Sequence, residues 1–202
     1  MKITNNQYIS KHKIKSTLDR FDSHLNSQST CNISTACYQS KNLSLFKGVS
    51  DEMYCGGNTT FEYAYFLLSN PNDSNVNIFV QNTITTNYSN YPISSKVYYC
   101  VEDIMGNLDS SNNITITNSN SSGKMPYGKI YFGNDLDKIY GTYGHSLIIS
   151  PYSMYKSSEN GDVIISPGYS YLFEISPINI ENDSNFIMSF SWWEEPFSTF
   201  VD

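Results

Sequence analysis

Apolar and polar residues alternate with a period of two along most of the chain after residue 60, which is typical of half-buried β-strands. The segment 76–86 (VNIFVQNTITT) shows this most clearly, because Val76, Ile78 and Val80 fall on one face. Short continuous apolar runs accompany the alternation, and Gly, Pro, Asn, Asp or Ser bound nearly every run. We predict strands over residues 60–69, 76–86, 95–103, 113–117, 128–135, 145–155, 161–168, 169–180 and 185–193.

The strands follow one another without intervening helices, which argues against a parallel α/β fold. Prolines lie at strand ends or turns, where a sheet tolerates them, and Pro167-Gly168 forms a turn signal between two apolar runs. We therefore predict a mainly β fold, an antiparallel β-sandwich with a jelly-roll-like number of strands.

One segment has a helical period instead. Residues 10–26 (SKHKIKSTLDRFDSHLN) place four apolar side chains on one face, at Ile14, Leu18, Phe21 and Leu25. This predicts a short amphipathic helix within an N-terminal arm, residues 1–30, followed by a single β-sandwich domain, residues 31–202.

The composition is rich in Asn (23), Ser (31) and Thr (13) and contains only 2 Ala and 1 Arg, which disfavours helix. The net charge of −7 is unevenly spread, since 5 of the 12 basic residues lie in the first 20 positions beside one acid. The remainder holds 7 basic and 18 acidic residues, or −11, and should repel nucleic acid. Nucleic acid is therefore an unlikely partner except through the N-terminal arm.

The sequence is compatible with more than one cellular location. The first ten residues (MKITNNQYIS) lack the apolar core of a signal peptide, and no window approaches 18 consecutive apolar residues. Virion, extracellular and cytoplasmic locations all remain compatible with this. Eight N-x-S/T triplets occur, but a chain so rich in Asn, Ser and Thr produces about five by chance, so glycosylation depends on entry to the secretory pathway.

Four cysteines, Cys31, Cys37, Cys55 and Cys100, allow three pairings. They lack C-x-x-C spacing, and the three histidines lie far from any cysteine pair in sequence, so we expect no zinc site. Disulfides and reduced thiols remain alternatives. In an extracellular protein, Cys31 or Cys37 would pair with Cys55 or Cys100.

No catalytic pattern stands out. His145, Ser146 and the nearby acids Asp135 and Asp137 invite a Ser–His–Asp interpretation, but G-x-S-x-G is absent and adjacency in sequence makes no triad. The Asn- and Asp-rich stretches 70–75 and 133–138 could offer oxygens to calcium, yet neither matches an EF-hand loop. We expect no enzyme activity, no metal and no cofactor, although a site gathered from separate strands would leave no linear trace.

The most distinctive run is FIMSFSWWEEP, Phe186 to Pro196. On a strand, one face is fully apolar and includes Trp192, whereas the other is mostly polar and carries Trp193. Trp192 is therefore expected in the core, and Trp193 is the candidate surface anchor. The alternative is that the C-terminal tail covers Trp193. The residues that we expect to form an interface are Trp193, Glu194, Glu195 and Phe197.

Two functions from different classes follow. The first is a non-enzymatic structural or self-assembling β-sandwich, of the virus-shell or surface-assembly type, acting as a homo-oligomer through aromatic and polar interfaces. The second is a membrane- or glycan-binding module, including a pore former, in which the amphipathic segment 10–26 lies on a bilayer surface.

Overall fold

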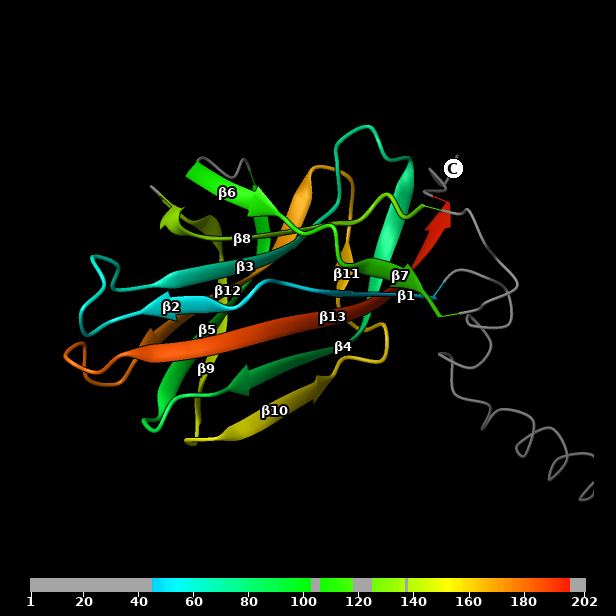
Figure 1. The fold of residues 1–202 in the computed structure, drawn as a ribbon. Coiled ribbons are helices and arrows are strands. Elements are labelled where there is room, and N and C mark those ends of the chain that lie inside the picture. The colour runs from blue at the N-terminus through cyan, green and yellow to red at the C-terminus, as the bar shows by residue number, and fades with distance from the viewer. Residues whose placement is uncertain (1–44, 103–105, 118–124, 137, 197–202) are drawn as a thin grey trace, which may run out of the picture. The chain divides into compact units, whose positions relative to one another are not determined.

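The computed structural model describes residues 45–102, 106–117, 125–136 and 138–196, all within one compact unit of the chain. These residues form strands and connecting turns, without helix in the part described, and every strand pair is antiparallel. The strands build two sheets, as Figure 1 shows. The predicted mainly β, antiparallel two-sheet fold is confirmed.

The first sheet follows the order β10-β4-β13-β1-β7, with β11 also paired to β4 and β2 to β13. Its centre is the long antiparallel pair β4–β13, with β1 on the other side of β13 (Figure 1). The strands of this sheet are β1 (Leu45–Val49), β2 (Met53–Cys55), β4 (Val76–Asn87), β7 (Ile114–Ile116), β10 (Ser153–Ser158), β11 (Ile164–Ile165) and β13 (Ser184–Pro196).

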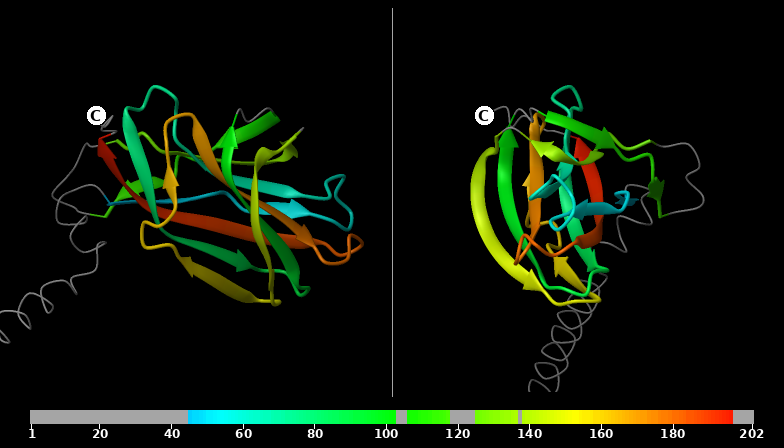
Figure 2. Two further views of the ribbon diagram at one scale, coloured as in Figure 1. Left: turned by 180° about the vertical axis from the view of Figure 1, so that it is seen from behind. Right: turned by 60° about the vertical axis from the view of Figure 1, so that its left-hand side comes forward.

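The second sheet follows the order β6-β8-β3-β12-β5-β9, so that β6 and β9 are its edges. The right-hand view of Figure 2 shows the two sheets facing one another, with β9 outermost. The strands of this sheet are β3 (Ala64–Ser69), β5 (Ile93–Glu102), β6 (Gly106–Ser110), β8 (Lys129–Leu136), β9 (Tyr140–Ile149) and β12 (Tyr169–Pro177).

The core lies between the sheets, because each strand directs its alternate apolar side chains toward the facing sheet. On β13 the alternate residues from Phe186 to Trp192 are at most 1% exposed. Aromatic rings link the sheets: Phe66 meets Phe186 at a centroid distance of 5.9 Å, and Phe173 meets Phe190 at the same distance. The alternation read from the sequence therefore identified the core face of β13 correctly.

Some elements differ from the expectation. The predicted strand 145–155 is two strands, β9 and β10, because the turn at Pro151 and Tyr152 carries the chain from one sheet to the other. Strand β6, Gly106–Ser110, lies outside every strand that we predicted. The predicted helix 10–26 lies outside the described residues, as does the boundary at residue 30, so the helix, the proposed domain limits and the membrane hypothesis stay predictions.

Candidate functional site

The two adjacent tryptophans of β13 are both buried. Trp192 is 0% exposed and belongs to the core cluster, as expected. Trp193 is only 3% exposed, so the expectation of a surface position is wrong. Its ring stacks on Phe79 of the paired strand β4 at 5.3 Å and an interplanar angle of 6°, and Gly161 approaches its far edge.

The two carboxylates that follow bond to these indoles. The Trp192 Nε1–H donates to Glu194 Oε1 at 3.1 Å, and the Trp193 Nε1–H donates to Glu195 Oε1 at 2.9 Å. Glu194 is 6% exposed and also accepts backbone N–H bonds from Tyr127 and Gly128. It is therefore a buried structural carboxylate, which satisfies donors that would otherwise lack partners.

These findings change the predicted interface set. Trp193 and Glu194 are enclosed by their own fold, whereas Glu195 is exposed and Phe197 lies outside the described residues. The sequence did contain a signal for the enclosure: Phe79 interrupts the alternation of β4 on the outward face, where a large ring needs a partner. Whether Glu195 and Phe197 meet a partner stays a prediction.

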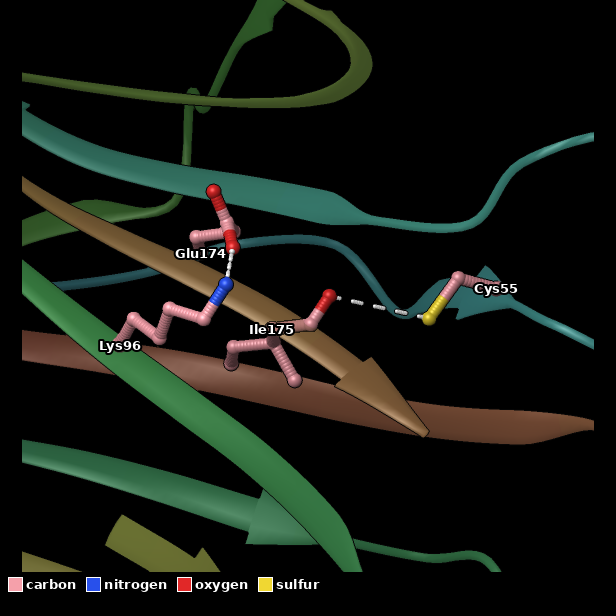
Figure 3. A network of polar contacts seen from close by, with 4 residues as sticks. All are labelled: Cys55, Lys96, Glu174 and Ile175. Atoms are coloured by element: carbon pink, nitrogen blue, oxygen red, sulfur yellow. Dashed lines mark hydrogen bonds and ion pairs between the residues drawn. The ribbon is translucent and has the colours of Figure 1, made fainter. Parts of the chain in front are cut away.

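The cysteines occupy different environments. Cys55 is buried, and its thiol points to the Ile175 carbonyl oxygen at 3.8 Å, as Figure 3 shows. Burial raises the pKa of the Cys55 thiol to about 12, so it stays protonated and unreactive at neutral pH. Cys100 is exposed, and neither Cys55 nor Cys100 forms a disulfide within the described part of the chain. Cys31 and Cys37 lie outside the described residues, and a bridge to them in an extracellular setting stays a prediction.

The residues that invited a catalytic interpretation lie apart. His145 and Ser146 are neighbours on β9 and leave opposite faces of the strand. Asp135 is on β8, and three strands separate β8 from β9 in the sheet. That separation amounts to about 19 Å across the sheet, beyond any direct hydrogen bond between these groups. Among the described residues, no group of three or more His, Cys, Asp or Glu could hold a metal ion.

A charge pair joins two neighbouring strands of the second sheet. Lys96 on β5 donates to Glu174 on β12 at 2.5 Å (Figure 3), and Lys96 also lies 5.6 Å from the centroid of the Tyr63 ring. The hydrogen bond to Glu174 raises the pKa of Lys96. Because each partner is satisfied by the other, this pair is a structural bond across the two strands rather than a reactive centre.

A continuous exposed surface lies instead at one side of the sandwich. Strand β9 is the edge of the second sheet and β10 the edge of the first, and residues 150–152 join them. Asn87 fixes this connection by donating from Nδ2 to the Ile149 and Ser150 carbonyls. We call this surface the β9–β10 edge. Its large exposed side chains are Tyr140, Tyr143, Ile148, Tyr152, Met154 and Tyr155, each 43–74% exposed.

Half of β9 is a regular free edge. Residues His145–Ile149 pair with Ile93–Val97 without interruption, whereas the register shifts at Gly144 and again toward Tyr140. Gly144 leaves no room for a side chain, because an added Cβ would lie 2.2 Å from the Tyr99 ring. The bulge twists the first half of β9 away from a neighbour, which leaves His145–Ile149 as the part that could accept another strand.

Most of the β9–β10 edge also lacks charge, since its Lys156 lies in the second half of β10. Residues 139–155 contain no Asp, Glu, Lys or Arg, although the whole chain carries −7. Natural edge strands commonly use charged residues, especially Lys, to prevent pairing with another chain. Here the side chain at Ile148 is apolar, 69% exposed and directed to the outer face.

A family model matches residues 16–199, and the chain belongs to that family, a family of unknown function (DUF6143). No curated protein matches. Among solved structures, hydroquinone 1,2-dioxygenase from Sphingomonas sp. TTNP3 is similar at 8% identity and a TM-score of 0.28, covering 68% of this chain and 64% of the dioxygenase chain. The chain therefore spans less than two thirds of that enzyme chain.

Two virus particle proteins are similar at the same low level. The Kashmir bee virus empty particle gives 10% identity and a TM-score of 0.30, covering 81% of this chain and 74% of the viral one. The 60-mer BFDV capsid protein gives 7% identity and a TM-score of 0.20, covering 78% of this chain and 96% of the capsid chain. Similarities of this size define no function. No helix among the described residues is long and apolar enough to cross a membrane.

Proposed function

We propose that the protein is a non-enzymatic structural β-sandwich that assembles with copies of itself through the β9–β10 edge. The observation that carries this proposal is the regular stretch His145–Ile149 at the edge of the second sheet, which contains no Asp, Glu, Lys or Arg and exposes Ile148. An edge strand presents unpaired N–H and C=O groups, and another strand can satisfy them by continuing the sheet.

The distribution of charge makes the β9–β10 edge the surface through which a second copy can approach most easily. Two copies of a chain with a net charge of −7 repel one another over most of their surfaces. The repulsion is weakest where the approaching segments carry no charge, and residues 139–155 meet that condition. Antiparallel pairing of His145–Ile149 with itself also gives a two-fold contact, the commonest symmetry of soluble oligomers.

The exposed side chains would add to the backbone pairing. Ile148 and Tyr143 lie beside the regular edge and are 69% and 53% exposed. Tyr143 already makes an edge contact with Tyr98 at 5.7 Å, so its ring is partly ordered before a partner arrives. Aromatic and aliphatic anchors of this kind provide much of the binding energy in protein interfaces.

Size-exclusion chromatography with light scattering tests the proposal. The wild-type protein should show at least twice the chain mass of 22.9 kDa. Ile148→Lys should shift it toward the monomer, because it removes an apolar contact and places two like charges diagonally across the strand pair. Ile178→Lys is the matched control, because Ile178 is 53% exposed but lies after β12. A wild-type monomer at every concentration and salt, or equal behaviour of the two variants, would contradict the proposal.

A further inference from the structure

Small polar side chains and one ion pair lie together on the outer face of the second sheet. By register, Ser176 on β12 lies opposite Ser94 on β5. In the next row that points away from the core, Lys96 on β5 lies opposite Glu174 on β12 and Ser146 on β9. We call these five residues the polar strip. It crosses three neighbouring strands, which is about 10 Å from β12 to β9.

The polar strip has hydrogen-bonding groups that a ligand can reach. Ser146 is exposed, and Ser94 and Ser176 are half-buried. Within the described part of the chain, the hydroxyl groups of these three serines have no hydrogen-bond partner. The Lys96 side chain is 39% exposed and donates one of its three N–H groups to Glu174, which leaves two for a ligand.

Tyrosine rings border the polar strip on two sides. Tyr63, which directly precedes β3, is 37% exposed and lies next to Tyr65, with 6.4 Å between the ring centroids. The Tyr63 centroid is also 5.6 Å from Lys96 Nζ. On the other side of Lys96, the Tyr98 ring of β5 meets the Tyr143 ring of β9 at 5.7 Å. Exposed aromatic surface therefore adjoins the hydroxyl groups of the strip.

The polar strip carries no net charge. Lys96 and Glu174 are its only charged side chains, and they bind one another at 2.5 Å, as Figure 3 shows. The Lys96 ammonium is the more accessible of the two, because the Glu174 side chain is only 10% exposed, so a cationic ligand is repelled. An anionic ligand meets Glu174 and the net charge of −7 of the whole chain. The charges therefore favour a neutral ligand.

We propose that the polar strip and its bordering tyrosines bind a neutral carbohydrate chain. Sugar hydroxyl groups donate and accept hydrogen bonds, which suits the serine hydroxyls and the free N–H groups of Lys96. The C–H faces of sugar rings pack on exposed tyrosine surface such as that of Tyr63. A purely apolar ligand would instead take Lys96 and the serines out of water without giving them partners, which is costly.

This proposal goes beyond self-assembly and does not depend on it. Of the polar strip, only Ser146 belongs to the β9–β10 edge, so a single copy presents nearly the whole site. A monomeric protein could still bind sugar, and an assembled one could lack this activity.

Saturation-transfer NMR on the full chain tests the proposal, because it observes the ligand and applies equally to a monomer and to an assembly. The neutral probes are cellotetraose, maltotetraose and the tetramer of N-acetylglucosamine. The charged comparisons are the tetramer of glucosamine, at a pH where its amino groups are protonated, and the tetramer of galacturonic acid. Each is titrated to about 10 mM, above the millimolar dissociation constants that a few hydrogen bonds sustain. At least one neutral tetramer should bind saturably, and more tightly than both charged ones.

Tyr63→Ala should weaken binding of that neutral tetramer about tenfold, because it removes a ring on which a sugar packs. Tyr127→Ala is the matched control, since Tyr127 is 51% exposed, precedes β8 and lies outside the strip and its border. Ser94→Ala keeps every ring and should weaken binding about threefold through the loss of one hydrogen bond.

Four results would each overturn the proposal. They are the absence of saturable binding by any neutral tetramer, binding of a charged tetramer at least as tight, equal affinity of Tyr63→Ala and Tyr127→Ala, and a fall in assembled mass in Tyr63→Ala. The last result, measured by light scattering, would assign this face to a contact between copies of the chain.

Discussion

Trp193 and Phe79 lie side by side on paired strands with their rings parallel, 5.3 Å between centroids and 6° from coplanar. This contact covers an outward-facing indole that strand alternation alone would leave in solvent. Its neighbour Trp192 faces the core and is fully buried. The two adjacent tryptophans therefore stabilise the fold from opposite faces of β13.

Both tryptophans should consequently be costly to remove. We expect Trp192→Ala and Trp193→Ala each to lower the free energy of unfolding by about 3–5 kcal/mol, as truncations of large buried rings do. Denaturant melts of the single variants measure this. Met125→Ala, at a site 79% exposed and outside the β9–β10 edge, is the control and should change stability by about 0.5 kcal/mol or less. A loss at Trp193 no larger than the control would show that its ring is not enclosed.

The Glu194 carboxylate should matter for folding in spite of its charge. It accepts hydrogen bonds from the Trp192 indole and from the backbone N–H groups of Tyr127 and Gly128. Glu194→Gln replaces one of the accepting oxygens by an NH₂ group, which is a donor and faces the same N–H donors. We expect this to lower the free energy of unfolding by about 2–3 kcal/mol. Chemical denaturation tests this against exposed Glu181→Gln, and equal stability of the two variants would exclude the buried network.

Stability should fall at alkaline pH. Burial raises the pKa of the Cys55 thiol from 9.0 to about 12, and burial together with Glu174 raises the pKa of Tyr65 from 10.0 to about 12. Both groups lose their protons at lower pH in the unfolded chain than in the folded one. Their contribution to the free energy of unfolding is therefore complete below pH 9 and decreases as the pH rises to about 12.

Denaturant melts between pH 8 and about 11.5 measure this dependence. Tyr65→Phe removes one of the ionising groups while it keeps the ring, so its stability should fall less steeply above pH 10. Tyr127→Phe, at an exposed site outside the β9–β10 edge, is the control. If the free energy of unfolding fell equally steeply with pH in Tyr65→Phe and in the wild type, Tyr65 would ionise equally in the folded and unfolded states.

The sequence predicted the fold class and the core face of β13 because alternation and turn residues are local signals. It did not predict the burial of Trp193, since that depends on Phe79, more than a hundred positions earlier in the chain. The β9–β10 edge was also missed. The pattern over 145–155 reads as one strand, and only the pairing of sheets shows that Ile148 and Met154 lie on two different edges.

Hydrogen exchange tests the central claim, self-assembly through the β9–β10 edge, most directly. Free edge amides exchange quickly, and pairing with a second strand protects them. Over about a hundredfold range of protein concentration, the amides of His145–Ile149 should become more protected as assembly proceeds by mass action. The opposite edge, β6, should exchange at a constant rate. Exchange at His145–Ile149 that is independent of concentration in an assembled protein would contradict the account.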